Sequence, residues 1–159
     1  MDENITESVV KTVREILKKM QCEADVKVKE IDEEENVFID ISSKEEIGRI
    51  IGKEGATLKA LELLIRAIAG KQFSQSVKIV LDADNYLLKR EESLKSNALD
   101  VAEKVEKRGI PIELGEMTPR ERRIIHMFLE GRKKIHTYSR GEGKERRLVI
   151  APGPAPQND

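Results

Sequence analysis

Two glycines separated by two residues form the most informative stretch of the chain, Gly52-Lys53-Glu54-Gly55. Glycine lets the backbone turn tightly and approach a ligand without a Cβ atom in the way. Amide groups at the start of the helix expected to follow favour an anion, and Lys53 adds a formal positive charge. The spacing therefore indicates a loop that holds part of a sugar-phosphate chain.

The residues beside this loop extend the predicted contact surface. Ile50, Ile51 and Leu58 are apolar and are expected to form the floor of a groove for bases. Arg49 and Lys59 add positive charge, whereas Glu54 places a carboxylate beside the expected phosphate path and should weaken binding. The spacing is neither the GxxxxGK[ST] of nucleotide hydrolases nor the GxGxxG of dinucleotide-binding proteins.

A second candidate is the pair formed by Arg122 and His126, which lie four residues apart on a predicted helix and so leave the same face. Both side chains donate hydrogen bonds, and either can stack on a base. Together they make a compact grip for a phosphate or a base. Taken alone, the pair fits equally well a solvated arginine next to a histidine at the edge of the core.

Charge is distributed unevenly along the chain, although the net charge is only -1. Residues 1–84 carry 13 Lys and Arg against 18 Asp and Glu, whereas residues 111–159 carry 10 against 7. All 10 of those basic residues lie within 118–147, together with 4 acidic ones. A patch of that density can engage phosphates even in a nearly neutral molecule.

Composition argues against several other classes of protein. A single Cys and two His provide no zinc set and no internal disulfide, and no nucleophile and base stand at a useful spacing, so we expect neither a cofactor nor an enzyme. No apolar run approaches the roughly 20 residues of a membrane helix, which predicts a cytoplasmic protein without a membrane segment. The few Phe and Tyr residues are too scattered to predict a stacking platform.

The elements that position the glycine loop follow from hydrophobic spacing. A helix is expected over residues 6–20, followed by strands at 25–31 and 36–41 with an acidic turn at 32–35. Ser43 and Glu46 form a capping-box pattern that announces a helix to about Ile51. After the loop, a helix to Gly70 and a strand at 77–81 complete the order helix, strand, strand, helix, helix, strand.

The second half reads as one long helix followed by a small sheet and another helix. The long helix is expected over 85–108, and Thr118, Pro119 and Glu121 mark the start of a helix that ends near Gly131. Ile124, Ile125, Phe128 and Leu129 should form its buried side. Strands are expected at 112–114, 135–139 and 147–150, before a disordered proline-rich tail at 152–159.

These elements predict an α+β chain with two small domains, residues 1–83 and 84–151. The first resembles a KH domain of the prokaryotic type II, on the run IIGKEGATL and on the element order. The resemblance implies that the loop clamps about four nucleotides of single-stranded RNA. The expected contacts are Arg49, Ile51, Gly52, Lys53, Gly55, Leu58 and Lys59.

Residues 85–151 resemble the R-xxx-H domain, which is named for an Arg and a His separated by three residues and binds single-stranded nucleic acid. The resemblance lies in TPRERRIIH, HTYSRGEG and RRLVI, with Arg122 and His126 as the name-giving pair. It implies a binding surface formed by Arg122, Arg123, His126, Thr137, Ser139, Arg140 and Arg147.

A KH domain followed directly by this domain resembles the bacterial Jag, or SpoIIIJ-associated, proteins. The resemblance implies RNA binding, a regulatory role in cell elongation and division, and pairing with a small single-KH protein. The separate N-terminal domain of many Jag proteins has no counterpart in this sequence.

Two hypotheses remain open. One is a two-site binder of single-stranded RNA, or of single-stranded DNA at the second site. The other is an interaction adaptor, in which the KH half dimerises or binds protein and only the basic half contacts nucleic acid.

Overall fold

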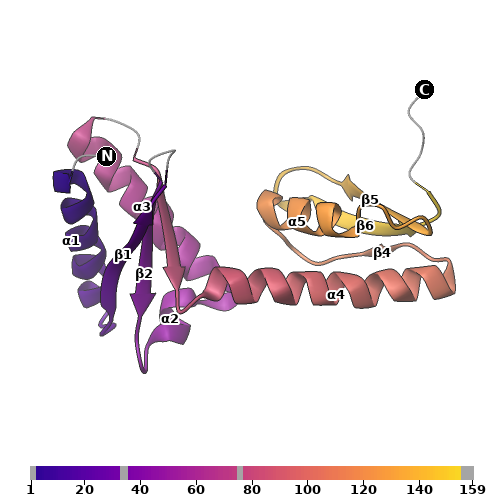
Figure 1. The fold of residues 1–159 in the computed structure, drawn as a ribbon, viewed down its shortest axis with the longest axis horizontal. Helices are drawn as coiled ribbons and strands as arrows, with labels where there is room; N and C mark the ends of the chain where they lie inside the picture. Colours follow the sequence, from indigo (N-terminus) through magenta and orange to yellow (C-terminus); the bar gives the residue numbers. More distant parts are fainter. Residues whose placement is uncertain (1–2, 33–35, 75–76, 155–159) are drawn as a thin grey trace. The chain divides into compact units, whose positions relative to one another are not determined.

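Two separate three-stranded sheets, each packed with helices, make up the chain in a computed structural model that describes residues 3–32, 36–74 and 77–154 (Figure 1). The contacts divide the chain into an N-terminal unit that ends at Leu87 and a C-terminal unit that begins at Leu88. This arrangement confirms the predicted α+β class with two modules.

The N-terminal unit has the predicted order helix, strand, strand, helix, helix, strand. A 3-10 turn, η1 (Lys53–Gly55), joins the two central helices. The other elements are α1 (Glu3–Lys19), β1 (Asp25–Ile31), β2 (Val37–Ser42), α2 (Ile47–Ile51), α3 (Ala56–Phe73) and β3 (Ile79–Ala83). In the sheet, β2 lies between the other strands, antiparallel to β1 and parallel to β3.

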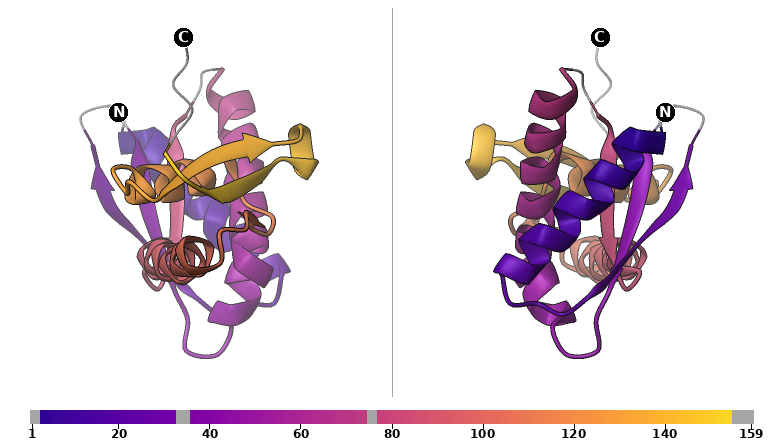
Figure 2. Two further views of the ribbon diagram at one scale, coloured as in Figure 1. Left: turned by 90° about the vertical axis from the view of Figure 1, so that its right-hand side faces the viewer. Right: turned by 90° about the vertical axis from the view of Figure 1, so that its left-hand side faces the viewer.

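One face of this sheet forms the core of the N-terminal unit. Val37, Ile39 and Ile41 alternate with more exposed residues along β2, and β3 repeats the pattern. Helices α1 and α3 pack against each other and against the strands on this face (Figure 2, right). Because α2 and α3 flank η1, the core holds both ends of the glycine loop.

Two helix ends in this unit differ from the predictions. Helix α2 begins only at Ile47, although Ser43 Oγ does accept the Glu46 backbone N–H at 3.1 Å. Helix α3 continues through Gly70 and ends at Ser74, which adopts the left-handed conformation. Phe73 packs against the core, so the extra turn buries apolar surface that a stop at Gly70 would leave in water. Residues 33–35 of the predicted turn lie outside the described residues.

Helix α3 also satisfies the outer edge of β3. The buried Glu62 carboxylate accepts the Leu81 backbone N–H at 3.2 Å, and the Arg66 guanidinium donates to the Ile79 carbonyl at 2.8 Å through Nε. Glu62 is further held by Lys59 at 2.6 Å and by Arg66 at 3.4 Å. A buried carboxylate needs such donors, because an uncompensated charge in the core would be strongly destabilising.

The C-terminal unit is built on the long helix α4 (Tyr86–Arg108), whose first two residues belong to the N-terminal unit. Its other elements are β4 (Ile112–Glu113), α5 (Pro119–Leu129), β5 (Ile135–Arg140), η2 (Gly143–Glu145) and β6 (Arg147–Pro152). The sheet is antiparallel, with β6 in the centre. Leu94, Ala98, Ala102 and Val105 of α4 pack with Ile125 and Leu129 of α5 and with Leu148 and Ile150 of β6.

Two predictions for this unit are corrected. Phe128 is 41% exposed instead of buried, because only Ile125 and Leu129 of α5 are fully turned into the core. Strand β6 continues through Pro152, and the Gly153 N–H donates to the Lys134 carbonyl at 2.9 Å, so ordered structure extends past the predicted start of the tail. Residues 155–159 of the predicted tail lie outside the described residues.

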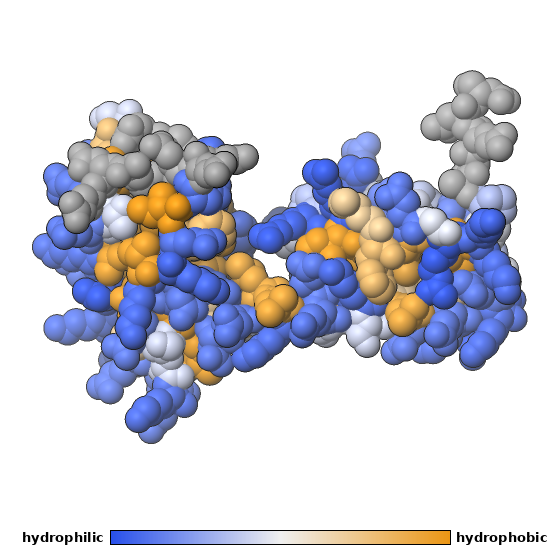
Figure 3. All heavy atoms as spheres, viewed as in Figure 1, coloured by the Kyte–Doolittle hydropathy of each residue, from blue (hydrophilic) through white to orange (hydrophobic). Residues whose placement is uncertain are grey.

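Hydrophilic side chains cover most of the surface that Figure 3 shows for each unit, as a charged content of 37% leads one to expect. Within the described residues, no helix is long and apolar enough to span a bilayer. The same residues contain no group of three or more His, Cys, Asp or Glu placed to hold a metal ion.

Candidate nucleic-acid interface

The glycine loop requires glycine at both of its ends. Gly52 has φ 72° and ψ -177°, a combination essentially restricted to glycine, and a Cβ atom there would clash with Thr57 Oγ1. Its N–H donates to the Gly48 carbonyl at 2.8 Å and so closes α2. The chain reverses here in a conformation that no other residue type adopts without strain.

Gly55 is constrained by a neighbour as well as by its backbone. Its φ of 79° is left-handed, and a Cβ atom would lie 2.7 Å from the ring of Tyr86, the first residue of α4. Between the glycines, Glu54 is itself left-handed, at φ 51° and ψ 31°. The buried Gly55 thus fixes the loop on the N-terminal unit, while Lys53 and Glu54 remain exposed.

The three basic side chains predicted around the loop are not equally available. Arg49 donates to Glu46 Oε2 at 2.7 Å and to the Met20 carbonyl at 3.1 Å, and the hydrogen bond to Glu46 raises the pKa of the guanidinium. Lys59 is paired with Glu62. Among the residues that the structure describes, Lys53 has no hydrogen-bond or ion-pair partner. Lys53 is therefore the cation of this loop that can meet a phosphate at no cost to existing contacts.

The predicted apolar floor is reduced to one residue. Ile50 is 0% exposed and Leu58 is 3% exposed, and both belong to the core of the N-terminal unit. Ile51 is only partly buried. Leu58 supports the loop from beneath, and Ile51 alone offers apolar surface to a ligand.

The capping box predicted at the start of α5 is confirmed. Thr118 Oγ1 accepts the Glu121 N–H at 3.2 Å, while the Glu121 carboxylate accepts the Thr118 N–H at 2.7 Å. Glu121 also accepts Arg90 Nε of α4 at 2.8 Å. Burial raises the pKa of Glu121, but the Thr118 and Arg90 donors outweigh it and hold the pKa below its usual range. The first turn of α5 is therefore fixed before any ligand arrives.

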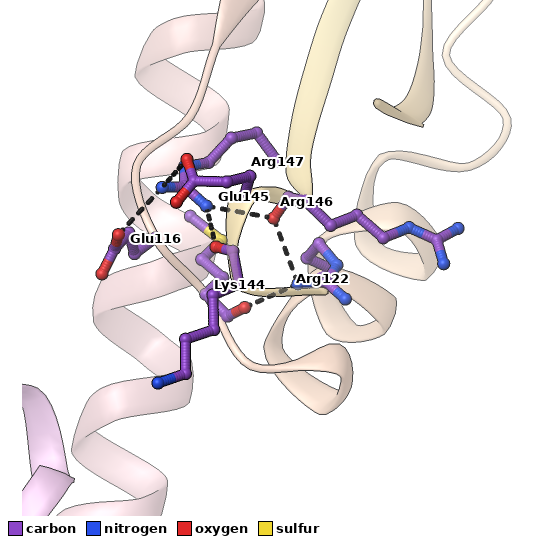
Figure 4. Close-up of polar contacts among 7 residues, drawn as sticks. Glu116, Arg122, Lys144, Glu145, Arg146 and Arg147 are labelled. Carbon is purple, nitrogen blue, oxygen red and sulfur yellow. Dashed lines mark hydrogen bonds and ion pairs between the residues drawn. The ribbon is translucent and has the colours of Figure 1, made fainter. Parts of the chain in front are cut away.

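Arg122 and His126 leave this helix toward two different supports. The Arg122 guanidinium donates to the Met117 carbonyl at 2.6 Å and to the Arg146 carbonyl at 3.4 Å (Figure 4). Nδ1 of His126 lies 2.5 Å from Thr137 Oγ1 on β5. Both side chains are thus positioned by groups outside α5. His126 remains exposed and Arg122 partly exposed, so the pair offers oriented donors to solvent.

Arg147 is held by its own unit. Its guanidinium pairs with Glu116 at 2.8 Å and with Glu145 at 3.6 Å, and it donates to the Lys144 carbonyl, which leaves the side chain 15% exposed (Figure 4). These contacts tie the β5–β6 connection to the segment before α5. The structure thus gives Arg147 a role in supporting the site and little free surface.

The remaining predicted contacts are more open. Arg123, Ser139 and Arg140 are exposed, and within the described part of the chain neither arginine side chain has a hydrogen-bond or ion-pair partner. Ser139 lies two residues beyond Thr137 on β5 and so faces the same side of the sheet. The structure brings Arg122, His126, Thr137 and Ser139 to one side of this unit.

Two supporting residues escaped the sequence patterns. Tyr86 packs on Gly55, and Arg90 binds Glu121, in each case across 31 positions of sequence. No periodicity links such distant residues. The only available signal was that a capping-box glutamate near a long charged helix can take an ion-pair partner from it.

Comparison with known proteins defines the two units. Residues 10–81 match the KH domain of KhpA and KhpB, and residues 92–152 match the R-xxx-H domain, the domain named for its Arg and His. We call the two units the KH unit and the R-xxx-H unit from here on. The fold and the matches together define a protein in which a KH domain precedes an R-xxx-H domain.

Relatives extend these matches across both units. The RNA-binding protein KhpB of Clostridium symbiosum is 30% identical over 149 residues, which cover 94% of this chain and 67% of that protein. The RNA-binding protein KhpB of Bacillus subtilis is 42% identical over 109 residues, covering 67% of this chain and 52% of that protein. The RNA-binding protein KhpA of Thermotoga maritima is 37% identical over 57 residues, covering 35% and 76%.

The chain belongs to the KhpB (Jag) family of RNA-binding proteins. It spans 67% of the length of the Clostridium symbiosum relative and about half of the Bacillus subtilis one.

Proposed function

We propose that this chain is a cytoplasmic, non-catalytic protein that binds single-stranded RNA through both units and regulates cell elongation and division. The family supports the first part, because its members carry the name RNA-binding protein. The regulatory role follows the resemblance to Jag proteins. In this proposal the protein acts by occupying RNA or by presenting it to partners.

The observation that carries the proposal is the support given to Arg122 and His126. Both have backbone or hydroxyl partners that fix their direction, yet His126 stays exposed. Fixed donors lose less side-chain entropy when they bind a ligand. The planar guanidinium of Arg122 suits a phosphate, and the imidazole of His126 can donate to one or stack on a base.

The glycine loop of the KH unit supplies a second contact. Its two glycines allow backbone amides to approach a phosphate, and Lys53 adds a charge without losing an intramolecular partner. The exposed Glu54 carboxylate opposes this attraction. We therefore expect the KH unit to bind RNA more weakly than the R-xxx-H unit does.

A second candidate function is supported by the charges of the KH unit. Arg49 and Lys59 are each paired with a carboxylate, and residues 1–84 carry an acidic excess. In the adaptor hypothesis the KH unit therefore binds protein, either a small single-KH protein or a second copy of this chain. Only the R-xxx-H unit then contacts RNA.

A double-mutant cycle tests the main proposal. Arg122→Ala and His126→Ala should each weaken binding to a single-stranded RNA by about 1 kcal/mol or more, and the double variant by less than the sum, since coupled neighbours are not additive. Arg123→Ala on the exposed side of the same helix is the matched control and should cost less. Strict additivity, together with an Arg122→Lys variant of full affinity, would leave only an unspecific basic surface.

Salt dependence and the KH loop separate the two candidates. For single strands, the logarithm of affinity should fall against the logarithm of salt with a slope of about -0.7 per phosphate contacted. Replacing Lys53 and Glu54 together by Asp should make the slope shallower if the loop holds RNA. If slope and affinity stay unchanged in a folded variant, the KH unit does not contact RNA and the adaptor function gains.

A further inference from the structure

The face of the R-xxx-H sheet that points away from α5 carries two rings that the site above does not use. Successive side chains of a strand point to opposite faces, and Thr137 faces α5 through His126. His136 and Tyr138 therefore lie on the opposite face. Their ring centroids are 5.8 Å apart with planes 25° apart, and Tyr138 is 43% exposed.

A small apolar floor lies beside these rings. The antiparallel register pairs His136 with Ala151 and Tyr138 with Val149, and directly opposite residues share a face. Ala151 and Val149 are each 5% exposed. The floor is closed, so a ligand on this face meets the rings and their edges instead of entering a cavity.

Positive charge completes the surface. Arg140 follows Tyr138 by two positions and so lies on the same face, and within the described residues its guanidinium has no partner. The His136 ring is held in place, because Nδ1 donates to the Gly153 carbonyl at 3.1 Å. A fixed ring and an unengaged cation at neighbouring positions offer both stacking and charge.

We propose that Tyr138, with His136 and Arg140, forms a second RNA-contact surface of the R-xxx-H unit that stacks on bases. Every base has a π-face, so aromatic side chains beside a cation bind single strands with little sequence preference. Counting only Phe and Tyr along the sequence gives no such platform. Strand alternation creates one here, because it places the imidazole of His136 next to the ring of Tyr138.

This inference rests on the proposed RNA-binding function, and its test separates the two. Affinity of the whole chain is measured for two oligomers of equal length, oligouridine and a sugar-phosphate oligomer without bases. Tyr138→Ala should lower affinity for oligouridine about fivefold or more, the range of one lost base stack, and leave the abasic oligomer within about twofold. Tyr138→Phe should keep wild-type affinity for both.

Phe128→Ala is the matched control, since Phe128 is similarly exposed, at 41%, but lies on α5. It should leave both affinities unchanged, and thermal melts should show that each variant is folded. Equal losses of Tyr138→Ala on both oligomers would overturn the stacking proposal. So would unchanged binding of Tyr138→Ala while Arg122→Ala still loses affinity, a result that would leave the RNA-binding function standing and indicate another occupant of this face.

Tyrosine emission provides an independent readout, because the chain has two Tyr and no Trp. In a Tyr86→Phe background, emission comes from Tyr138 alone. Stacking should quench it on addition of oligouridine and leave it unchanged with the abasic oligomer. Equal emission changes with both oligomers would contradict base stacking.

Discussion

Thr137 Oγ1 lies 2.5 Å from Nδ1 of His126, so β5 directly fixes the direction of the histidine on α5. Thr137→Val keeps the shape of the side chain and removes the hydroxyl. We expect RNA affinity to fall about threefold to tenfold, corresponding to one lost hydrogen bond of about 0.5–1.5 kcal/mol. Thr137→Ser is the control and should retain affinity. Equal affinity of the Val and Ser variants would show that the orientation of His126 does not matter.

Glu121 should make the R-xxx-H unit sensitive to acid. The Thr118 and Arg90 donors lower its pKa in the folded state, so its contribution is complete above the unfolded pKa, near 4.5, and is lost as the pH falls through the folded pKa. Glu121→Gln should therefore lower the melting temperature at pH 7 and flatten its decline in acid. Parallel acid profiles of variant and wild type, measured by thermal melts, would contradict this assignment.

Asp40 of the KH unit should behave in the opposite way. Desolvation raises its pKa, and Asp82, its register partner on β3, adds to the effect. The folded state thus favours the protonated form, and the stability that this gives is present below the unfolded pKa, near 3.8, and is lost as the pH rises through the folded pKa.

Asp40→Asn should accordingly stabilise the KH unit at neutral pH by a few tenths of a kcal/mol, the usual size of a cross-strand repulsion. The gain should vanish below about pH 4. Thermal melts at pH 7 and pH 3.5 measure both. A gain of equal size at the two pH values would indicate a cause other than the carboxylate charge.

The glycine loop should tolerate alanine at one glycine but not at another. Gly55→Ala introduces a Cβ at a left-handed φ and against Tyr86, and we expect a loss of more than about 1 kcal/mol in the free energy of unfolding. Gly48→Ala is the matched control, because that Cβ would meet nothing within 4 Å and alanine favours a helix. Chemical denaturation compares them. Equal stabilities would argue against a rigid loop.

Local patterns in the sequence predicted much of the fold. The capping box of α5 and the alternation in β2 involve residues a few positions apart, so their geometry follows from local chemistry. The burial of Leu58 and the exposure of Phe128 were not predicted, because helical spacing gives the direction of a side chain and not what lies opposite it.

The candidate site was predicted in its residues more than in their roles. Arg147 was expected to contact nucleic acid, but Glu116, 31 positions away, binds its guanidinium. Lys59 was expected to be free, but it supports the buried Glu62. Such pairings depend on the tertiary fold, which brings distant carboxylates to basic side chains that look solvated in the sequence.

The side chains of Glu62 and Arg66 act as a substitute neighbour for β3. An outer strand normally presents open N–H and C=O groups that template the addition of another chain. At Leu81 and Ile79 these groups are already occupied by side chains of α3. An incoming β-strand would have to displace a buried carboxylate, so this border of the sheet resists both fibril nucleation and strand exchange. The Leu81 amide hydrogen should consequently exchange with solvent at the slow rate of an interior strand.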